Sequence, residues 1–121
     1  MSGQKILVVD DSPTELKVIS QALESGGYDV VTAKDGEEAL KMVSKEPVNL
    51  IVLDVIMPKM NGFQVCRQIK SSDQYKGIKV ILLTSKSQDS DKFWGKKQGA
   101  DLYMTKPFEI DTLIKNVANM I

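Results

Sequence analysis

The sequence has 121 residues, of which 42% are hydrophobic and 26% charged, and its 16 basic and 16 acidic side chains give a formal net charge of zero. These totals are typical of one globular domain, and we expect a single domain over residues 1–121 without an output domain. The charge balance argues against nucleic acid as a partner, and no apolar run is long enough to span a membrane.

The only cysteine, Cys66, has no partner for a disulfide within the chain, and the sequence contains no histidine. A zinc site is therefore not expected, and we place the protein in the reducing cytoplasm. Cys66 lies on the apolar stripe of its predicted helix, so we expect a small core residue rather than a reactive thiol. With zero net charge and no obvious apolar patch, a monomer is the expected state.

Five short apolar runs alternate with segments of helical period. Three of the runs are apolar throughout, which is typical of central strands in a parallel sheet that helices cover on both faces. Because Tyr28–Thr32 contains a charged residue, we predict that it lies at an edge of the sheet. The predicted strands are Ile6–Val9, Tyr28–Thr32, Leu50–Leu53, Val80–Leu83 and Leu102–Met104.

The segments between these runs have the terminal signals of helices. The first helix is expected to begin with a capping box at Ser12 and Glu15, with Pro13 at its first position, and to end at Gly26-Gly27. Alternating elements of this length predict an α/β fold with a parallel sheet, although the pattern leaves the strand order open. The later helices open at Asp35-Gly36, at Asn61-Gly62, at about Ser90 and just before an apolar face of Ile110, Leu113, Ile114 and Val117.

Polar residues follow the predicted strands at the point where each ends. In open α/β sheets ligands bind beyond the carboxyl ends of the strands. Asp10-Asp11 follows the first strand and Asp54 the third, whereas Thr84 follows the fourth and Lys106 the fifth. We therefore expect three carboxylates, a hydroxyl and an ammonium group to converge at one edge of the sheet.

A divalent cation would make this cluster stable. Three neighbouring carboxylates raise one another's pKa, and a bound cation removes the repulsion. Mg²⁺ prefers hard oxygen ligands and commonly binds one or two carboxylates together with phosphate oxygens. Lys106 would then pair with one phosphoryl oxygen and Thr84 would donate to another. The expected chemistry is phosphoryl transfer by positioning and charge neutralisation.

A series of motifs runs along the chain in order: Val9–Ser12, Leu53–Pro58, Asn61-Gly62, Leu83–Ser85, Gly99–Asp101 and Tyr103–Phe108. In these motifs the sequence closely resembles the CheY-like receiver family of two-component signalling, and the resemblance covers essentially the whole chain. It implies a flavodoxin-like, five-stranded parallel sheet of order 2-1-3-4-5 with helices on both faces.

The resemblance also implies a role for each residue at the acidic edge. Asp54 would be the nucleophile and phosphoacceptor. Asp11, Asp54 and the backbone carbonyl of Ile56 would ligate Mg²⁺, for which Mn²⁺ can substitute, and Asp10 would act mainly through a metal-bound water.

Further roles follow for the basic and switch residues. Lys106 would pair with the phosphoryl group, and Thr84 would bond it and shift towards it. Tyr103 would be an aromatic switch that follows Thr84 inward. The peptide bond between Lys106 and Pro107 would be cis. The protein would catalyse its own phosphorylation and dephosphorylation, but no reaction of a separate substrate.

Three other classes of protein share parts of this pattern. A flavodoxin-like cofactor binder would need a Gly-, Ser- and Thr-rich phosphate loop where this chain has Asp10-Asp11. A phosphatase of the haloacid dehalogenase type would need a second aspartate at Ile56. A purely structural pseudo-receiver would not need the complete set of acidic, hydroxyl and ammonium groups. No Walker-type loop is present, which excludes an ATP-driven kinase.

The segment Ser85–Asp101 resembles single-domain regulators of chemotaxis-like systems for type IV pili, twitching and phototaxis, the PilH-like group. This resemblance implies a CheA-like histidine kinase or phosphotransfer domain as phosphodonor. A downstream protein would bind the face of the fourth helix, fifth strand and fifth helix. An intermediate phosphate carrier or a phosphate sink in a multi-step phosphorelay is the alternative role.

The aromatic pair Phe93-Trp94 lies in the predicted fourth helix. We expect one ring to cover the sheet edge and the other to be half buried, although exposed aromatic rings can also anchor a partner. Gly95 costs about 1 kcal/mol relative to Ala inside a helix. We hypothesise that it weakens this helix and lets the output face rearrange.

Overall fold

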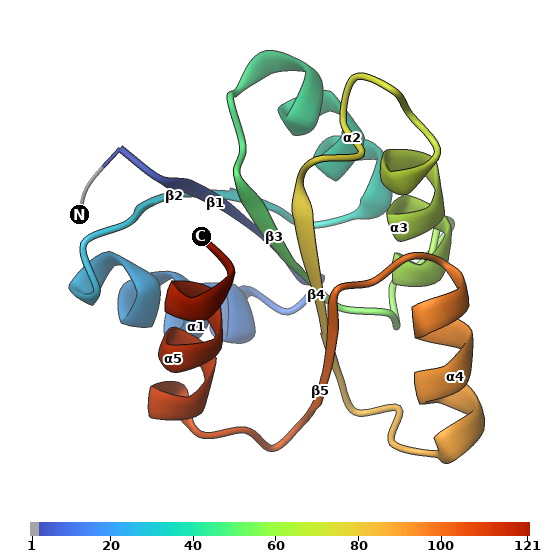
Figure 1. The fold of residues 1–121 in the computed structure, drawn as a ribbon. Helices are drawn as coiled ribbons and strands as arrows, with labels where there is room; N and C mark the ends of the chain where they lie inside the picture. The colour runs from blue at the N-terminus through green and yellow to red at the C-terminus, as the bar shows by residue number, and fades with distance from the viewer. Residues whose placement is uncertain (1–2) are drawn as a thin grey trace.

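The computed structural model describes residues 3–121 and shows a twisted sheet between two layers of helices (Figure 1). Met1 and Ser2, the first residues of the domain expected over 1–121, lie outside the described residues. The strands are β1 (Lys5–Val9), β2 (Asp29–Ala33), β3 (Leu50–Leu53), β4 (Lys79–Thr84) and β5 (Leu102–Thr105). The helices are α1 (Pro13–Ser25), α2 (Gly36–Lys45), α3 (Gly62–Lys70), α4 (Asp89–Lys97) and α5 (Ile110–Met120).

All neighbouring strands pair in parallel, in the order β2-β1-β3-β4-β5. This confirms the predicted fold class and strand order, and it places β2 at an edge as the charged residue in its sequence suggested. β1 and β3 are neighbours in the middle of the sheet, so the residues that follow them are brought side by side.

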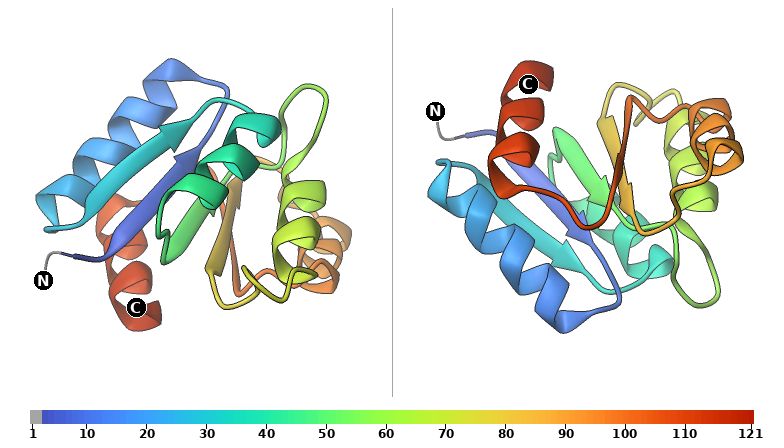
Figure 2. Two further views of the ribbon diagram at one scale, coloured as in Figure 1. Left: turned by 90° about the horizontal axis from the view of Figure 1, so that it is seen from above. Right: turned by 90° about the horizontal axis from the view of Figure 1, so that it is seen from below.

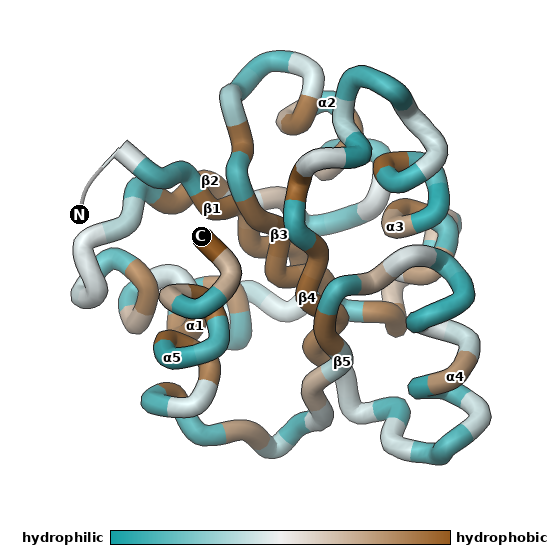
Figure 3. The backbone as a smooth tube through the Cα atoms, in the orientation of Figure 1, coloured by the Kyte–Doolittle hydropathy of each residue, from teal (hydrophilic) through white to brown (hydrophobic). Residues whose placement is uncertain are grey.

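The two faces of the sheet carry separate apolar cores. Helices α1 and α5 cover one face, whereas α2, α3 and α4 lie on the other (Figure 2). Alternate residues of a central strand therefore point into different cores: Leu7 and Val9 contact the second group of helices, and Ile6 and Val8 contact the first. The hydropathy colouring shows the strands as the most apolar part of the chain (Figure 3). None of the helices within residues 3–121 is both long and apolar enough to cross a membrane.

The first helix begins differently from the predicted capping box. The Ser12 hydroxyl accepts a hydrogen bond from the Glu15 amide at 3.3 Å, as expected. The second half of the box is wrong, because the Ser12 amide donates to Asp10 Oδ1 at 2.9 Å instead of to Glu15. A complete capping box occurs at α3, where Asn61 and Gln64 satisfy each other's backbone amides.

The packing of α4 corrects the expectation for its aromatic pair. Trp94 is 50% exposed and so is half buried, as expected of one of the two rings, but Phe93 is 61% exposed and does not cover the sheet edge. Gly95 is the residue of α4 that faces it: a Cβ at Gly95 would lie 2.7 Å from the ring of Tyr103 and 3.0 Å from Leu82 Cδ1. The glycine permits close approach of helix and sheet, which is a structural reason for its presence that the hypothesis of a weak helix did not include.

Candidate functional site

Three carboxylates meet at the carboxyl edge of the central strands. Asp10 and Asp11 follow β1, and Asp54 follows β3, where its amide donates to the Val9 carbonyl at 3.0 Å. One carboxylate oxygen from each of the three lies within 4.8 Å of the others. Asp10 and Asp54 are only 2% and 8% exposed, whereas Asp11 is open to solvent.

Lys106 brings a single ammonium group into this cluster from the end of β5. Its Nζ lies 2.8 Å from Asp10 Oδ2 and 3.5 Å from Asp54 Oδ2. The Lys106 amide donates to the Thr84 carbonyl at 2.9 Å, which ties the turn after β5 to the end of β4. The Lys106–Pro107 peptide bond is cis. One positive charge thus faces three carboxylates.

Glu15 is a member of the cluster that the sequence reasoning missed. Its Oε1 lies 3.1 Å from Lys106 Nζ, and its side chain is partly exposed. Sequence reasoning assigned Glu15 to the helix cap. The first turn of the helix after β1 starts at the same edge of the sheet as the acidic cluster. A carboxylate in that turn could therefore have been predicted to lie near Lys106.

The site shifts the pKa of two of its members. Burial raises the pKa of Asp54, and the neighbouring Asp10 charge adds to this, while the Lys106 charge and hydrogen bonds from Ile56 and Thr84 oppose it. Burial lowers the pKa of Lys106, but hydrogen bonds to Asp10 and Glu15, together with the carboxylate charges, outweigh it, and the pKa is raised. Lys106 therefore remains a cation over the physiological range.

The start of α3 supports the loop after Asp54. The Gly62 amide donates to the Val55 carbonyl at 2.9 Å, and a Cβ at Gly62 would overlap the carbonyl oxygen of Asp54. Only glycine allows this approach of the helix to the strand end. Ile56 donates its amide to Asp54 Oδ1 at 3.2 Å, while its side chain is 52% exposed. The coordination expected of the Ile56 carbonyl stays a prediction.

Thr84 and Tyr103 are linked through the loop that follows β4. Thr84 is fully buried, and its Oγ1 accepts from the Lys86 amide at 3.4 Å. The Tyr103 hydroxyl donates to the Lys86 carbonyl at 2.7 Å. Burial, reinforced by the charges of Asp91 and Asp54, raises the pKa of Tyr103 to about 12, so the phenol is a neutral donor. Movement of this loop would affect both side chains.

The donor set fits a hard divalent cation. Three carboxylates supply oxygen ligands only, and one ammonium group cannot neutralise all of them. Both oxygens of Asp10 accept short hydrogen bonds, from the Ser12 amide at 2.9 Å and from Lys106 at 2.8 Å, whereas those of Asp54 accept longer ones, from the Ile56 amide at 3.2 Å and from Lys106 at 3.5 Å. Oxygen ligands at an open, partly solvated edge are typical of Mg²⁺ rather than of zinc.

Comparison with known proteins identifies the family. The family model for the response regulator receiver domain matches residues 6–118 of the sequence. The chain therefore belongs to this family. Receiver domains are phosphoacceptor switches. The fold is CheY-like: the chemotaxis protein CheY4 of Vibrio cholerae superimposes with a TM-score of 0.91 over 98% of both chains, at 36% identity.

Two curated relatives differ in how much of their length is matched. PilH of Pseudomonas aeruginosa is 41% identical over 113 residues, which cover 93% of this chain and 93% of PilH. The alkaline phosphatase synthesis transcriptional regulatory protein PhoP of Bacillus subtilis is 45% identical over 118 residues, which cover 95% of this chain. That match spans 48% of PhoP, so the chain corresponds to about half of that regulator.

Proposed function

We propose that this receiver domain accepts a phosphoryl group on Asp54 from a histidine kinase or phosphotransfer domain. The observation that carries the proposal is the position of Lys106, whose ammonium group lies within 3.5 Å of Asp54 Oδ2 in a cluster of otherwise acidic groups. A cation held there is placed to pair with a phosphoryl oxygen once the carboxylate is phosphorylated to the acyl phosphate.

The transfer forms one bond and breaks one. The carboxylate of Asp54 attacks phosphorus, a P–O bond forms, and the P–N bond to the donor histidine breaks, leaving that ring to take up a proton. Asp54 must be ionised to attack. Burial raises the pKa of Asp54 in the metal-free site, whereas Mg²⁺ bound to the same carboxylate would lower it and keep the nucleophile ionised.

Asp11, Asp54 and the Ile56 carbonyl would hold Mg²⁺, with Asp10 acting through a water. When bound, the ion neutralises the charge on the phosphoryl oxygens. Lys106 pairs with one phosphoryl oxygen, and the Thr84 hydroxyl donates to another. Hydrolysis of the acyl phosphate at the same site would return the protein to its resting form.

The signal would leave the site through the loop after β4. When Thr84 moves towards the phosphoryl group, its hydroxyl no longer accepts the hydrogen bond from the Lys86 amide. The Lys86 carbonyl then moves, and the Tyr103 hydroxyl loses its hydrogen-bond acceptor. The α4–β5–α5 face then changes shape for a downstream protein. The similarity to PilH and CheY4 supports a chemotaxis-like motility pathway in the cytoplasm, with a CheA-like kinase as donor.

A phosphate carrier or sink in a multi-step phosphorelay is the second candidate. It requires only the site and no change of the α4–β5–α5 face. The hydrogen bond from Tyr103 to Lys86 favours the switch, because it couples that face to the strand end that holds Thr84.

The decisive experiment is mass spectrometry after incubation with acetyl phosphate and Mg²⁺. We expect a phosphoryl adduct on Asp54 in the wild-type protein and none after Asp54→Asn. Asp73→Asn is the matched control, since the Asp73 side chain is fully exposed in the loop that follows α3 and should leave the adduct unchanged. Equal adduct formation in Asp54→Asn and the wild type would contradict the proposal.

A further inference from the structure

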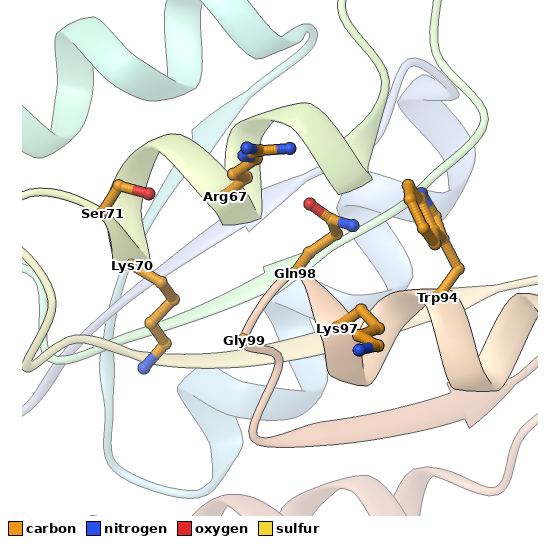
Figure 4. Close-up of a pocket in the computed structure, with 7 residues that line it drawn as sticks. All are labelled: Arg67, Lys70, Ser71, Trp94, Lys97, Gln98 and Gly99. Atoms are coloured by element: carbon orange, nitrogen blue, oxygen red, sulfur yellow. The ribbon is translucent and has the colours of Figure 1, made fainter.

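A surface groove between α3 and α4 carries features that phosphotransfer does not use. Its volume is about 510 Å³, and Arg67, Lys70, Trp94, Lys97 and Gln98 are among the residues that line it (Figure 4). None of these residues belongs to the acidic cluster. The groove lies on the edge of α4 that faces α3, apart from the α4–β5–α5 face.

The part of the chain that forms both helices of the groove is basic, although the whole chain is neutral. Ten basic and four acidic side chains occur between Lys59 and Lys106, against five basic and ten acidic ones in residues 1–58. Lys70 is already engaged, because its Nζ lies 2.9 Å from Asp101 Oδ2 and donates to the Ile78 carbonyl. Arg67 and Lys97 are exposed, and neither has an acidic partner within residues 3–121.

Gln98 supplies a second, independent observation. It is 8% exposed, and its backbone carbonyl accepts from the Cys66 thiol, but its side-chain amide makes no hydrogen bond within the described part of the chain. Figure 4 shows this amide directed into the groove between Arg67 and Trp94. A carboxamide offers a donor and an acceptor together, which matches the two hydrogen-bonding groups of a peptide backbone.

Trp94 provides the apolar surface of the groove. Its ring is 50% exposed beside the Gln98 amide, and Trp and Arg are the residues that contribute most at protein interfaces. A guanidinium binds a carboxylate through two parallel hydrogen bonds. Duplex nucleic acid is bound through a series of phosphate contacts, whereas Arg67 and Lys97 are the two groove cations without an acidic partner among the described residues, and the Lys97 ammonium group already lies 5.6 Å from the centroid of the Phe93 ring.

We infer that this groove binds an acidic segment of a partner protein in extended conformation. Carboxylates of the segment pair with Arg67 and Lys97, its backbone bonds the Gln98 amide, and an apolar side chain rests on Trp94. The interaction does not involve Asp54, so it provides a docking contact in addition to the phosphorylation site.

The test begins with a display library of random short peptides, selected in parallel on the wild-type protein and on an Arg67→Glu/Lys97→Glu variant. We expect the wild type to enrich peptides that combine several Asp or Glu residues with one large apolar residue, and the variant not to. Failure of acidic peptides to be enriched, or equal enrichment on both proteins, overturns the inference.

The best peptide is then titrated while the emission of Trp94, the only tryptophan, is followed. Arg67→Glu and Gln98→Leu should each weaken binding roughly tenfold, as expected for the loss of one charge-assisted or buried hydrogen bond. Lys41→Glu, an equal charge change on the exposed face of α2, should have no such effect, and Asp54→Asn should bind like the wild type. Circular dichroism of each variant verifies the fold.

Two other occupants are tested with the same variants. Single-stranded DNA that binds more tightly than the peptide and is lost in Arg67→Glu would make the groove a nucleic-acid site. Concentration-dependent dimerisation that Arg67→Glu abolishes would make a second copy of this chain the occupant. Either result overturns the proposal of an acidic partner segment. Because Asp54→Asn retains the groove, failure here leaves the phosphoacceptor proposal untouched.

Discussion

Glu15 shows how a tertiary charge can override a local signal. Its position three residues after Ser12 predicts a capping box, yet the Ser12 amide is taken by Asp10 and the Glu15 carboxylate pairs with Lys106 at 3.1 Å. The ammonium group attracts a carboxylate more strongly than a backbone amide does. Glu15 is therefore placed to compete with a phosphoryl oxygen for Lys106.

Replacing Glu15 by Gln should raise the affinity of the protein for beryllofluoride in the presence of Mg²⁺. A partly exposed ion pair is worth up to about 1 kcal/mol, so we expect a gain of roughly two- to fivefold. Isothermal titration calorimetry measures the change, and Glu24→Gln, the same substitution at an exposed position of α1, is the control. Weaker binding in Glu15→Gln would show that Glu15 assists the anion instead.

Cys66 behaves as the core residue that its position on the apolar stripe predicts. It is fully buried, and burial raises the pKa of its thiol from 9.0 to about 11. At neutral pH the folded protein therefore presents no thiolate, and the thiol is inert in the native state.

The same pKa shift should make stability fall between pH 9 and 11. In this range the unfolded chain loses the thiol proton while the folded chain retains it, so ionisation favours unfolding, by at most ~1.4 kcal/mol per pH unit. Urea unfolding over this range should show a shallower decline for Cys66→Ala than for the wild type, whatever the cost of the cavity. Parallel curves for the two proteins would mean that the thiol does not contribute.

At the scale of elements, α4 depends on the absence of one side chain. Gly95 faces the ring of Tyr103, and this ring is itself held by the bond from its hydroxyl to the Lys86 carbonyl. The position of the helix and the position of the tyrosine are thus linked. Phe93 and Trp94 remain exposed because Gly95 occupies the buried side of the helix.

Gly95→Ala should destabilise the protein although alanine is the better helix former. The helix gains about 1 kcal/mol, whereas forcing a methyl group into a filled space costs about 1–3 kcal/mol. We expect a net loss on the order of 1 kcal/mol in thermal or urea unfolding. In a Tyr103→Ala background Gly95→Ala should lower the free energy of unfolding by less, or raise it, because the Tyr103 ring that the new methyl group would meet is absent. An equal effect in both backgrounds would refute the packing explanation.

At the scale of the molecule, the sheet gathers acidic groups from distant parts of the chain at one edge. Asp10 and Asp54 come from neighbouring central strands, and Lys106 comes from the far end of the sequence. Repulsion among these carboxylates lowers the free energy of unfolding, and a bound cation would raise it again by removing the repulsion.

Mg²⁺ should therefore raise the stability of the whole fold. At a concentration ten times Kd, binding to the folded state alone stabilises it by about 1.4 kcal/mol. The melting temperature should rise with Mg²⁺ and return to its original value with a chelator. The rise should be lost in Asp11→Asn but kept in Asp73→Asn, whose side chain is fully exposed and outside the cluster. A rise that persists in Asp11→Asn would place the ion elsewhere.

The spacing of apolar residues along the chain predicted where the strands and helices lie, because each element buries a face that its own apolar residues form. The predicted strand Leu50–Leu53 coincides with β3, and each of the other predicted strands differs by one residue at one or both ends. Terminal signals were equally informative: the glycine pair after Ser25 ends α1, and Asn61 caps α3. These features are local in the chain.

The class of fold, the acidic strand ends and the core position of Cys66 could all be predicted from the sequence, since each follows from the order and spacing of residue types. Which groups touch depends on the folded arrangement of the elements. In the folded protein Glu15 pairs with Lys106 instead of capping its helix, and Gly95 packs against Tyr103. Helices α3 and α4 together line a basic groove. These contacts join residues distant in the chain, and their energies depend on distances that spacing along a sequence does not contain.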